Sequence, residues 1–175
     1  TLVGNDFIPR LPTINLGIGG GDALVSTYVE TSASRGRHLT SWDFNSKRTT
    51  VDIDMLMLLF EAIGTLEFEA LGVLSAQRLV ARDVDVDACV DPADMGEYRT
   101  RYSNTRFDTH TSDDVCVAYV NGIRWIIAYY VDGVVDWWWY YPHHHAPMAS
   151  AIARIDGMGA FARNRCASIT RKRAH

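Results

Sequence analysis

The sequence predicts a mostly α-helical chain with one or a few short strands. Apolar residues recur at helical spacing over residues 22–31, 51–71 and 113–131, and aromatic residues do so over 97–107. Apolar residues make up 47% of the 175 residues and the formal net charge is −4, which suits one globular domain with a core and excludes an intrinsically disordered chain. No apolar run reaches the length that spans a bilayer, and no secretory signal pattern is present, so no membrane partner is expected.

The first twelve residues, TLVGNDFIPRLP, predict the end of a buried strand followed by a turn. Leu2 and Val3 end the strand. Gly4 and Asn5 form the turn, and Asp6 follows at the carboxyl end of the strand, the edge where open α/β sheets bind ligands. On the residues alone two interpretations of Asp6 stay open: it holds a divalent cation, or it braces the turn or caps the next helix. Spacing by itself favours the structural role.

A short helix and a loop are expected next. The helix covers residues 22–31, and Asp22, which follows three glycines, is expected to cap it. Residues 32–48 contain Ser, Arg, Gly and Lys without a helical period, so they are predicted to form a loop with a small hairpin over residues 38–44.

A second helix is predicted over residues 51–71. Its apolar stripe consists of Ile53, Leu56, Phe60 and Ile63. Thr49, followed three residues later by Asp52, suits a capping box at the start of this helix. Gly72 is expected to end it.

The next region is acidic and is predicted to be a solvated loop. Its acidic residues are Asp83, Asp85, Asp87, Asp91, Asp94 and Glu97. The spacing of the first three is similar to that of a calcium-binding loop. However, Ala88 stands where such a loop needs glycine, and Asp94 stands where it needs a bidentate glutamate.

Residues 97–107, EYRTRYSNTRF, interleave arginine with tyrosine and phenylalanine. Such a pattern binds single-stranded nucleic acid through ion pairs and stacking. It is equally the pattern of an amphipathic helix whose aromatic residues lie in the core, and we favour this second interpretation.

A buried helix is predicted over residues 113–131. Ser112 is the expected cap, and Asp113 and Asp114 lie in the first turn, where the helix dipole favours negative charge. One apolar stripe consists of Cys116, Val120, Ile123, Ile127 and Tyr130, and a second of Ala118, Gly122, Trp125 and Tyr129. A helix that is apolar on two sides is buried, and Gly133 is expected to end it.

An aromatic loop, DWWWYYPHHHAP, follows at residues 136–147. Its three consecutive histidines point in different directions, which disfavours a single metal ion because the imidazoles would have to converge on it. Five tryptophans in a chain of this size, three of them consecutive, exceed what packing requires. At least one face of this loop is therefore expected to contact a planar ligand or a partner surface.

Two motifs in this chain resemble the Xrn family of 5′→3′ exoribonucleases. LVGNDFIPRLP, followed by glycines and a helix, resembles the family motif LVGNDFxPxLP and, more distantly, the Gly-x-Asp-Tyr pattern of flap endonucleases. YVNGIRWIIAYYVDGVVDWWWYYPHHHAPMAS, residues 119–150, resembles the family signature Y-V-x-G-L-x-W-V-L-x-Y-Y-Y-x-G-V-x-S-W-x-W-Y-Y-P-x-H-Y-A-P. The two matches occur in the family's order, and details of the first motif lie nearer the cytoplasmic branch than the nuclear one.

The resemblance implies a fold and a set of site residues. The parent enzyme would have an α/β core with a mixed sheet, similar to PIN and flap-endonuclease domains, and this chain would be its mostly helical C-terminal half. Asp6 would be the catalytic Mg²⁺ ligand. Trp137, or failing that Trp139, would stack on the base at the 5′ end of the RNA.

Some positions depart from the family pattern. Asp136 replaces a small residue, and Trp138 fills a position that is usually small. His145 stands where the family has tyrosine, and Ala151 stands where aspartate is common. The stretch between the two motifs is also much shorter than the family's long insertion.

The resemblance also implies a division of the chain and a partner. Residues 1–72 would contain the metal-ligand motif and helices, 73–112 a shortened linker, 113–162 the buried helix and aromatic loop, and 163–175 a basic tail. The remaining Mg²⁺ ligands and the pocket for the 5′ phosphate would come from an N-terminal half, where the family has them. Because residue 1 falls within the expected strand, the chain is expected to be a fragment of a longer polypeptide or a partner of a second chain. A chain with one matching carboxylate is expected to be inactive alone.

Two functions are therefore predicted. The first is part of a magnesium-dependent exoribonuclease that degrades 5′-monophosphorylated RNA to nucleotides. The alternative is a catalytically inactive scaffold in a ribonucleoprotein or protein complex. The three cysteines, Cys89, Cys116 and Cys166, are odd in number and lack paired spacing. They indicate reduced thiols and an intracellular protein, with the cytoplasm expected and the nucleus as the alternative.

The C-terminal tail is basic and contains no acidic residue after position 156. Its cationic residues are Arg163, Arg165, Arg171, Lys172 and Arg173. Contact with an RNA backbone is one interpretation. A solubilising tail or a localisation signal is the other.

Overall fold

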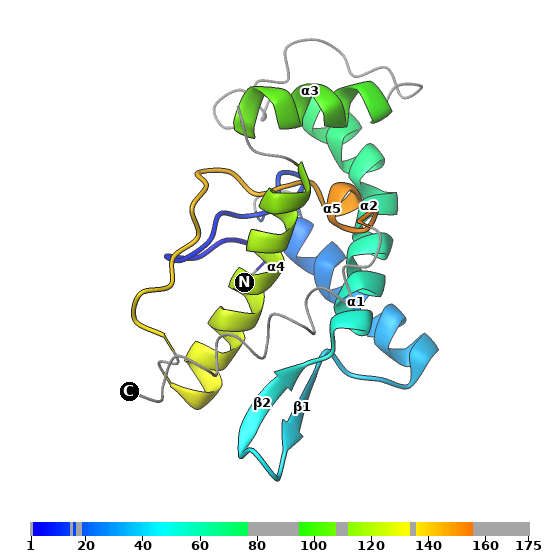
Figure 1. Cartoon of the computed structure of the whole chain (residues 1–175). Helices are drawn as coiled ribbons and strands as arrows, with labels where there is room; N and C mark the ends of the chain where they lie inside the picture. The colour runs from blue at the N-terminus through cyan, green and yellow to red at the C-terminus, as the bar shows by residue number, and fades with distance from the viewer. Residues whose placement is uncertain are drawn as a thin grey trace.

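The computed structural model describes residues 2–14, 16, 19–76, 95–107, 112–133 and 136–155. This part of the chain is mostly helical with one two-stranded hairpin, as predicted (Figure 1). The elements are α1 (Gly20–Arg35), β1 (Thr40–Asp43), β2 (Arg48–Val51), α2 (Ile53–Ala76), α3 (Met95–Phe107), α4 (Ser112–Asp132) and α5 (Ala149–Ile152). Among these described helices, none is both long and apolar enough to cross a membrane.

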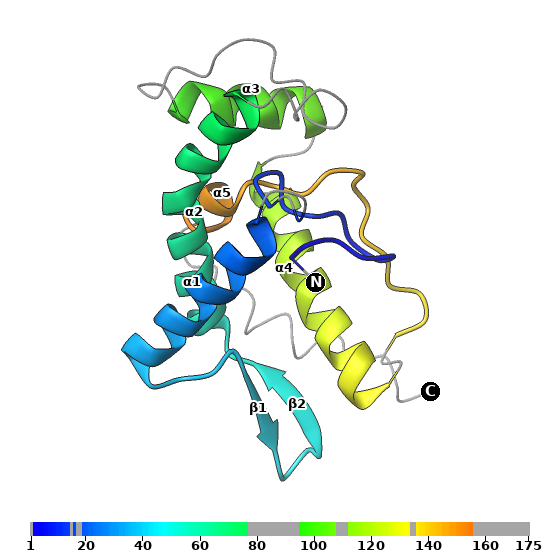
Figure 2. The same cartoon turned by 180° about the vertical axis from the view of Figure 1, so that it is seen from behind.

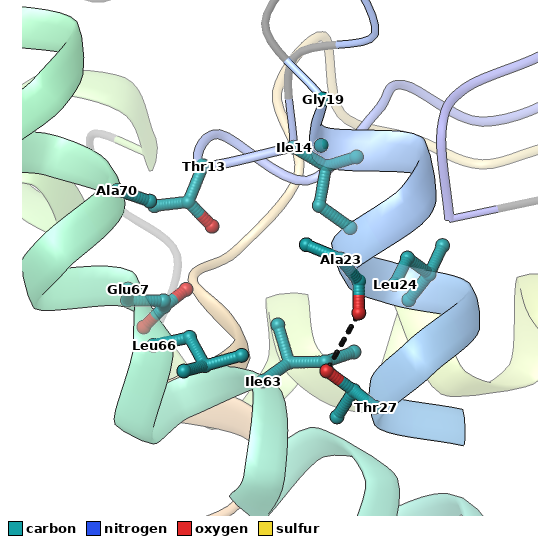
Figure 3. A pocket seen from close by; sticks show the side chains of 11 residues that line it. Thr13, Ile14, Gly19, Ala23, Leu24, Thr27, Ile63, Leu66, Glu67 and Ala70 are labelled. Carbon is teal, nitrogen blue, oxygen red and sulfur yellow. Dashed lines mark hydrogen bonds between the residues drawn. The ribbon is translucent and has the colours of Figure 1, made fainter. Parts of the chain in front are cut away.

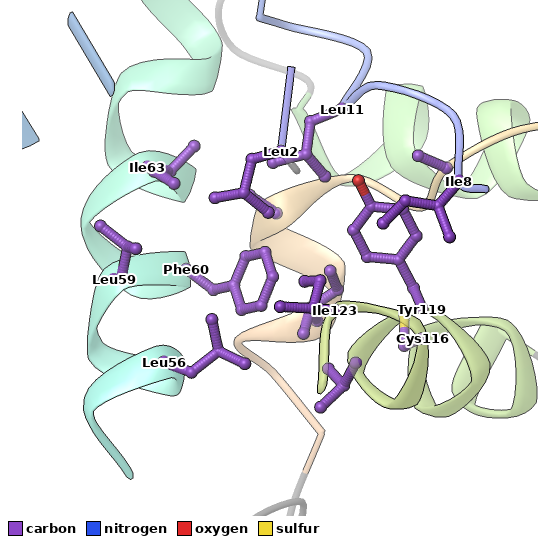
Figure 4. Packing of buried hydrophobic residues seen from close by; sticks show 14 of the residues in the cluster. Leu2, Ile8, Leu11, Leu56, Leu59, Phe60, Ile63, Cys116, Tyr119 and Ile123 are labelled. Carbon is purple, nitrogen blue, oxygen red and sulfur yellow. The ribbon is translucent and has the colours of Figure 1, made fainter. Parts of the chain in front are cut away.

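The main core lies between α2 and α4. Figure 4 shows Phe60 of α2 and Ile123 of α4 pointing toward each other, with residues of the N-terminal segment covering one side. Apolar burial of this kind is the main stabilising term in folding. Helix α1 packs on α2, and the short α5 lies against α2 as well, as both views of the molecule show (Figures 1 and 2).

A second, smaller core joins α3 to the rest of the molecule. Helix α3 lies across the C-terminal end of α2 (Figure 1). Its aromatic side chains Tyr98, Tyr102 and Phe107 are buried together with Leu71, Val115 and Met148. The prediction that the aromatic residues of 97–107 belong to the core is therefore confirmed.

The prediction of a strand that ends at Leu2 and Val3 is wrong. Residues 2–14 form turns and bends, and the Leu11 N–H donates to the Leu2 carbonyl at 3.1 Å. The buried residues of this segment are Leu2, Ile8, Leu11 and Ile14. All four side chains belong to the main core, so the chain folds back as a loop to bury Leu2 instead of placing it in a strand.

The ends of two helices also differ from the prediction. Helix α1 begins at Gly20 after Gly19, whose φ is 83°, and Asp22 lies inside the first turn instead of capping it. Helix α2 is capped by Asp52, whose Oδ1 accepts from the Met55 N–H at 3.0 Å. The same helix continues past Gly72 to Ala76.

The hairpin and α4 follow the prediction more closely. The hairpin forms a few residues later than expected, with Thr40 paired to Val51. Helix α4 starts and ends within one residue of the predicted bounds, and Gly133, with φ 86°, follows its last residue. Tyr130, which was expected in a buried stripe, is exposed. The predicted acidic loop, with Asp83, Asp85, Asp87, Asp91 and Asp94, lies outside the described residues.

Candidate functional site

Asp6 lies at the tip of a tight turn. The Asn5 side-chain oxygen accepts from the backbone N–H groups of Phe7 and Ile8, both at 3.0 Å. Gly4 has φ 87°, and a Cβ there would lie 3.0 Å from the Arg10 nitrogen, so only glycine fits. Asn5 therefore braces the turn. Asp6 is exposed, and no described residue donates a hydrogen bond to its carboxylate.

The N-terminal loop is anchored to α4 by aromatic contacts. The Phe7 ring meets the rings of Trp125 and Tyr129 edge-on, with centroid distances of 5.2 and 5.0 Å. The Tyr119 hydroxyl donates to the Pro9 carbonyl at 3.0 Å. Such aromatic pairs stabilise a packed interface beyond the area that they bury.

The aromatic loop packs on the same face of α4. The Trp139 ring stacks on Trp125 with a centroid distance of 4.8 Å and an interplanar angle of 23°. The Trp125 Nε1–H donates to the Asp136 carbonyl at 3.1 Å. A Cβ on Gly122 would lie 3.0 Å from Ile8 and 3.1 Å from Trp139. The two sequence motifs thus meet at one glycine of α4.

The tryptophans of the loop have different surroundings. Trp137 and Trp138 are 83% and 90% exposed, whereas Trp139 is half-buried. The Asp136 carboxylate accepts from the Trp138 N–H at 2.9 Å and braces this turn. Trp137 therefore offers a free aromatic face, and Trp139 is part of the packing that holds the loop.

Of the three consecutive histidines, His143 lies among aromatic side chains. His143 meets the rings of Phe107 and Tyr141 at centroid distances of 5.9 and 5.3 Å. The Tyr141 hydroxyl donates to the His145 carbonyl at 2.9 Å. Burial raises the pKa of Tyr141, with a further contribution from Tyr119 nearby, so the phenol stays a donor.

A complete magnesium site is not formed by the part of the chain that the structure describes. No group of three His, Cys, Asp or Glu side chains comes together within it. Asp6 suits a hard cation as one carboxylate ligand. The rest of such a site would have to come from other groups.

Sequence reasoning missed Glu67, which is 1% exposed. Its carboxylate accepts from the backbone N–H groups of Ala149 at 2.6 Å and Ser150 at 3.0 Å, and so fixes the chain where the aromatic loop ends. Burial raises the pKa of Glu67, and these hydrogen bonds oppose that rise. A glutamate at a core-facing position of the apolar run 51–71 is the signal that could have identified it.

A cavity of about 160 Å³ lies beside Glu67, between α1 and α2 (Figure 3). Most of the side chains that line it are apolar, among them Ile14, Leu24 and Ile63. The Thr27 hydroxyl donates to the Ala23 carbonyl at 2.7 Å and is thereby satisfied within α1. Glu67 is the ionisable side chain among the residues that line this cavity.

The predicted backbone contacts of the tail, at Arg163, Arg165, Arg171, Lys172 and Arg173, lie outside the described residues. Of the predicted site residues that are described, Asp6 lies in a loop that packs on α4 through Phe7, and Trp137 lies in a loop that packs on α4 through Trp139.

Comparison with known proteins agrees with the resemblance of the two motifs. The chain is 25% identical, over an alignment 224 positions long, to the 5′-3′ exoribonuclease 2 homolog of Drosophila melanogaster. That alignment covers 89% of this chain and 24% of the relative, so the chain spans about a quarter of the relative's length. Residues 74–164, which include α3, α4 and the aromatic loop, match the family model of the Xrn1 helical domain. More than half of the 175 residues are matched, and the chain therefore belongs to the Xrn1 helical domain family.

Proposed function

We propose that this chain is part of a magnesium-dependent 5′→3′ exoribonuclease that degrades 5′-monophosphorylated RNA processively to nucleotides, and that it is inactive by itself. Family membership supports the class of enzyme. The observation that bears most on the proposal is the packing of two loops on Trp125 of α4, one through Phe7 and the other through Trp139, while Asp6 and Trp137 in these loops are exposed.

In this proposal each described residue has a separate task. Asn5 and Gly4 hold Asp6 at the tip of its turn, where its carboxylate is one ligand of Mg²⁺. The metal would be shared with carboxylates outside this chain, and it would activate the attacking water and neutralise charge on the phosphate. Trp137 would stack on the 5′-terminal base, and Trp139 would hold the loop in place. The cytoplasmic location stays a prediction.

The metal role of Asp6 is tested by Asp6→Asn in the complete enzyme. This change removes the charge and keeps the shape, so cleavage of 5′-monophosphorylated RNA should fall by at least about 100-fold, the upper end of what loss of an outer-shell partner costs at metal sites. Asp22→Asn is the matched control, because Asp22 is exposed in the first turn of α1 and should tolerate the change. Unchanged turnover by Asp6→Asn would contradict the metal role.

The same experiment distinguishes the alternative function. If wild type and Asp6→Asn are equally inactive while both bind RNA, and the adjoining polypeptide lacks the other carboxylates, the chain serves as a non-catalytic scaffold. If the wild type cleaves RNA and Asp6→Asn does not, the result supports the exoribonuclease proposal.

A further inference from the structure

A cavity of about 440 Å³ opens between α3, the first turn of α4 and the chain that follows the aromatic loop. This volume lies within the range of small-molecule sites, roughly 300–1,000 Å³. Its polar lining comes from Arg99, Thr100, Ser103 and Asn104 of α3, Asp113 of α4, and Arg154 after α5. The Thr100 hydroxyl donates to the Gly96 carbonyl at 2.9 Å and is thereby satisfied within α3.

Arg99 and Arg154 both line this cavity. Burial and the positive charge of Arg154 lower the pKa of the Arg99 guanidinium. Neither arginine forms an ion pair within the described residues, whereas Arg101, on the exposed side of the same helix, pairs with Glu97 at 3.0 Å. Asp113 lines the cavity and the buried Glu67 attracts Arg99, but within the described part of the chain neither carboxylate forms an ion pair with either guanidinium.

The chemistry of the lining selects the ligand. Guanidinium groups match the oxygens of phosphate with two parallel hydrogen bonds, and they are weakly hydrated enough to bind in a partly closed cavity. Ser103 adds a hydroxyl and Asn104 an amide, both neutral donors. We propose that this cavity binds a phosphate group, with Arg99 and Arg154 as its cationic ligands and Ser103 and Asn104 as neutral donors.

The phosphate site is separate from the surface of Asp6 and Trp137. Asp113 lies twelve residues before Trp125 on α4, which corresponds to about 18 Å along the helix. Figure 1 shows α3 at the end of α4 where that helix begins, away from the end that leads into the aromatic loop. The phosphate has two possible sources. It belongs to the backbone of an RNA that continues along α4, and this source rests on the proposed function, or it belongs to a free nucleotide, and this source does not.

The test uses the complete polypeptide with Arg99→Gln and Arg154→Gln, and with Arg101→Gln as the matched control on the same helix. The probes are inorganic phosphate, AMP, and two single-stranded RNAs of different length with 5′-hydroxyl ends, all in the presence of EDTA so that no cleavage occurs. Loss of charge-assisted hydrogen bonds should weaken AMP binding roughly 10-fold or more in both cavity variants. Arg101→Gln should bind AMP like the wild type.

The RNA arms identify the source of the phosphate. If the longer RNA reaches the cavity, its affinity falls in the two cavity variants, and the salt dependence of log K loses about 0.7 of slope for each phosphate contact removed. If a free nucleotide is the ligand, AMP binding is lost and both RNAs bind unchanged. Neither arm requires nuclease activity, so failure of the exoribonuclease proposal in the Asp6→Asn test would be seen separately.

Two outcomes would overturn the proposal. One is that Arg99→Gln and Arg154→Gln bind every probe as Arg101→Gln does. The other is that an acidic peptide without phosphate binds the wild-type cavity as tightly as AMP. Arg154→Gln also controls for misfolding, because Arg154 is exposed and its replacement should leave the core intact.

Discussion

Trp137 and Trp139 stand two positions apart and have opposite surroundings. The Trp139 ring lies between the loop and α4, stacked on Trp125, while most of the Trp137 side chain faces solvent. An exposed indole with no packing partner contributes little to stability and is available for a base. A half-buried stacked indole stabilises the fold instead.

Alanine replacements should therefore separate binding from stability. Trp137→Ala should change the free energy of unfolding by less than about 0.5 kcal/mol and weaken RNA binding by about 1–3 kcal/mol. Trp139→Ala should cost about 2–4 kcal/mol of stability, somewhat less than the loss of a fully buried tryptophan. Urea unfolding and RNA titration measure the two quantities. A stability loss at position 137 as large as that at 139 would contradict the assignment.

Gly122 is the point where both loops touch α4. A methyl group there would come within 3.0 Å of Ile8 and 3.1 Å of Trp139, so both side chains would have to move. Gly122→Ala should destabilise the protein by about 1–3 kcal/mol, the usual cost of overpacking.

Gly96→Ala in α3 is the control for this change. A Cβ at Gly96 meets nothing within 4 Å, so alanine should be neutral or stabilise by up to about 1 kcal/mol through its better helix propensity. Urea unfolding of both variants decides the matter. Equal stability of the two variants would show that the loops adapt without cost.

At the scale of elements, α2 fixes α5 through one buried carboxylate. Glu67 accepts two backbone N–H groups of α5, at 2.6 and 3.0 Å. Gly64 lies beside the same contact, and a Cβ there would come within 2.9 Å of the Ser150 Cα. The close approach of the two helices therefore places the end of the aromatic loop at a defined position.

The buried carboxylate should give stability a characteristic pH dependence. Burial raises the pKa of Glu67 above its ordinary value of 4.5, so the folded protein keeps this proton to higher pH than the unfolded chain does. Between the two pKa values the native state binds more protons, and stability falls as pH rises through that window. The wild type should therefore lose stability relative to Glu67→Gln as pH rises from about 4.5, and the difference should level off above the raised pKa.

Urea unfolding over a series of pH values measures this difference. Glu69→Gln is the control, because Glu69 is exposed on the same helix and is not part of the contact with α5. If the free energy of unfolding of the wild type, relative to that of Glu67→Gln, stays constant or rises with pH, the result would contradict the burial argument.

Local signals predicted some elements well and others poorly. Helix α4 is bounded by acidic residues in its first turn and by Gly133 at its end, and its limits were predicted to within one residue. Gly72 was expected to end α2, but the helix continues over Gly72 to Ala76. The apolar pair Leu2–Val3 suggested a strand, but the loop closes through the bond from Leu11 to Leu2, nine residues apart, which no local pattern reveals.

The residues of the candidate site could be predicted from the sequence, but the contacts between them could not. The motifs identified Asp6, Trp137 and Trp139 as residues of interest, but which tryptophan packs depends on the contact of Trp139 with Trp125, across the turn that ends α4. Glu67 and the pair of Arg99 and Arg154 were missed for the same reason. Their surroundings come from segments far apart in the chain.

At the scale of the whole molecule, α4 is the common support of both loops. It is buried against α2 on one side and carries Phe7 and Trp139 on another, so Asp6 and Trp137 are held by one rigid element. A rigid support is what a shared metal and a stacked base require, since small displacements of catalytic groups are costly. The chain also spans only about a quarter of its relative from Drosophila melanogaster.

These facts lead to a prediction for the assembled enzyme. The chain alone should not cleave 5′-monophosphorylated RNA in the presence of Mg²⁺, because a single carboxylate does not hold hydrated magnesium against water. Co-expression with the polypeptide that supplies the remaining carboxylates should restore cleavage, and intact-mass measurement with peptide mapping should identify that polypeptide in the purified complex. Asp6→Asn should abolish turnover while the complex still forms, since Asp6 makes no described contact within the fold. Cleavage by this chain alone would show that its own residues complete the metal site and would overturn the division of the site between two halves.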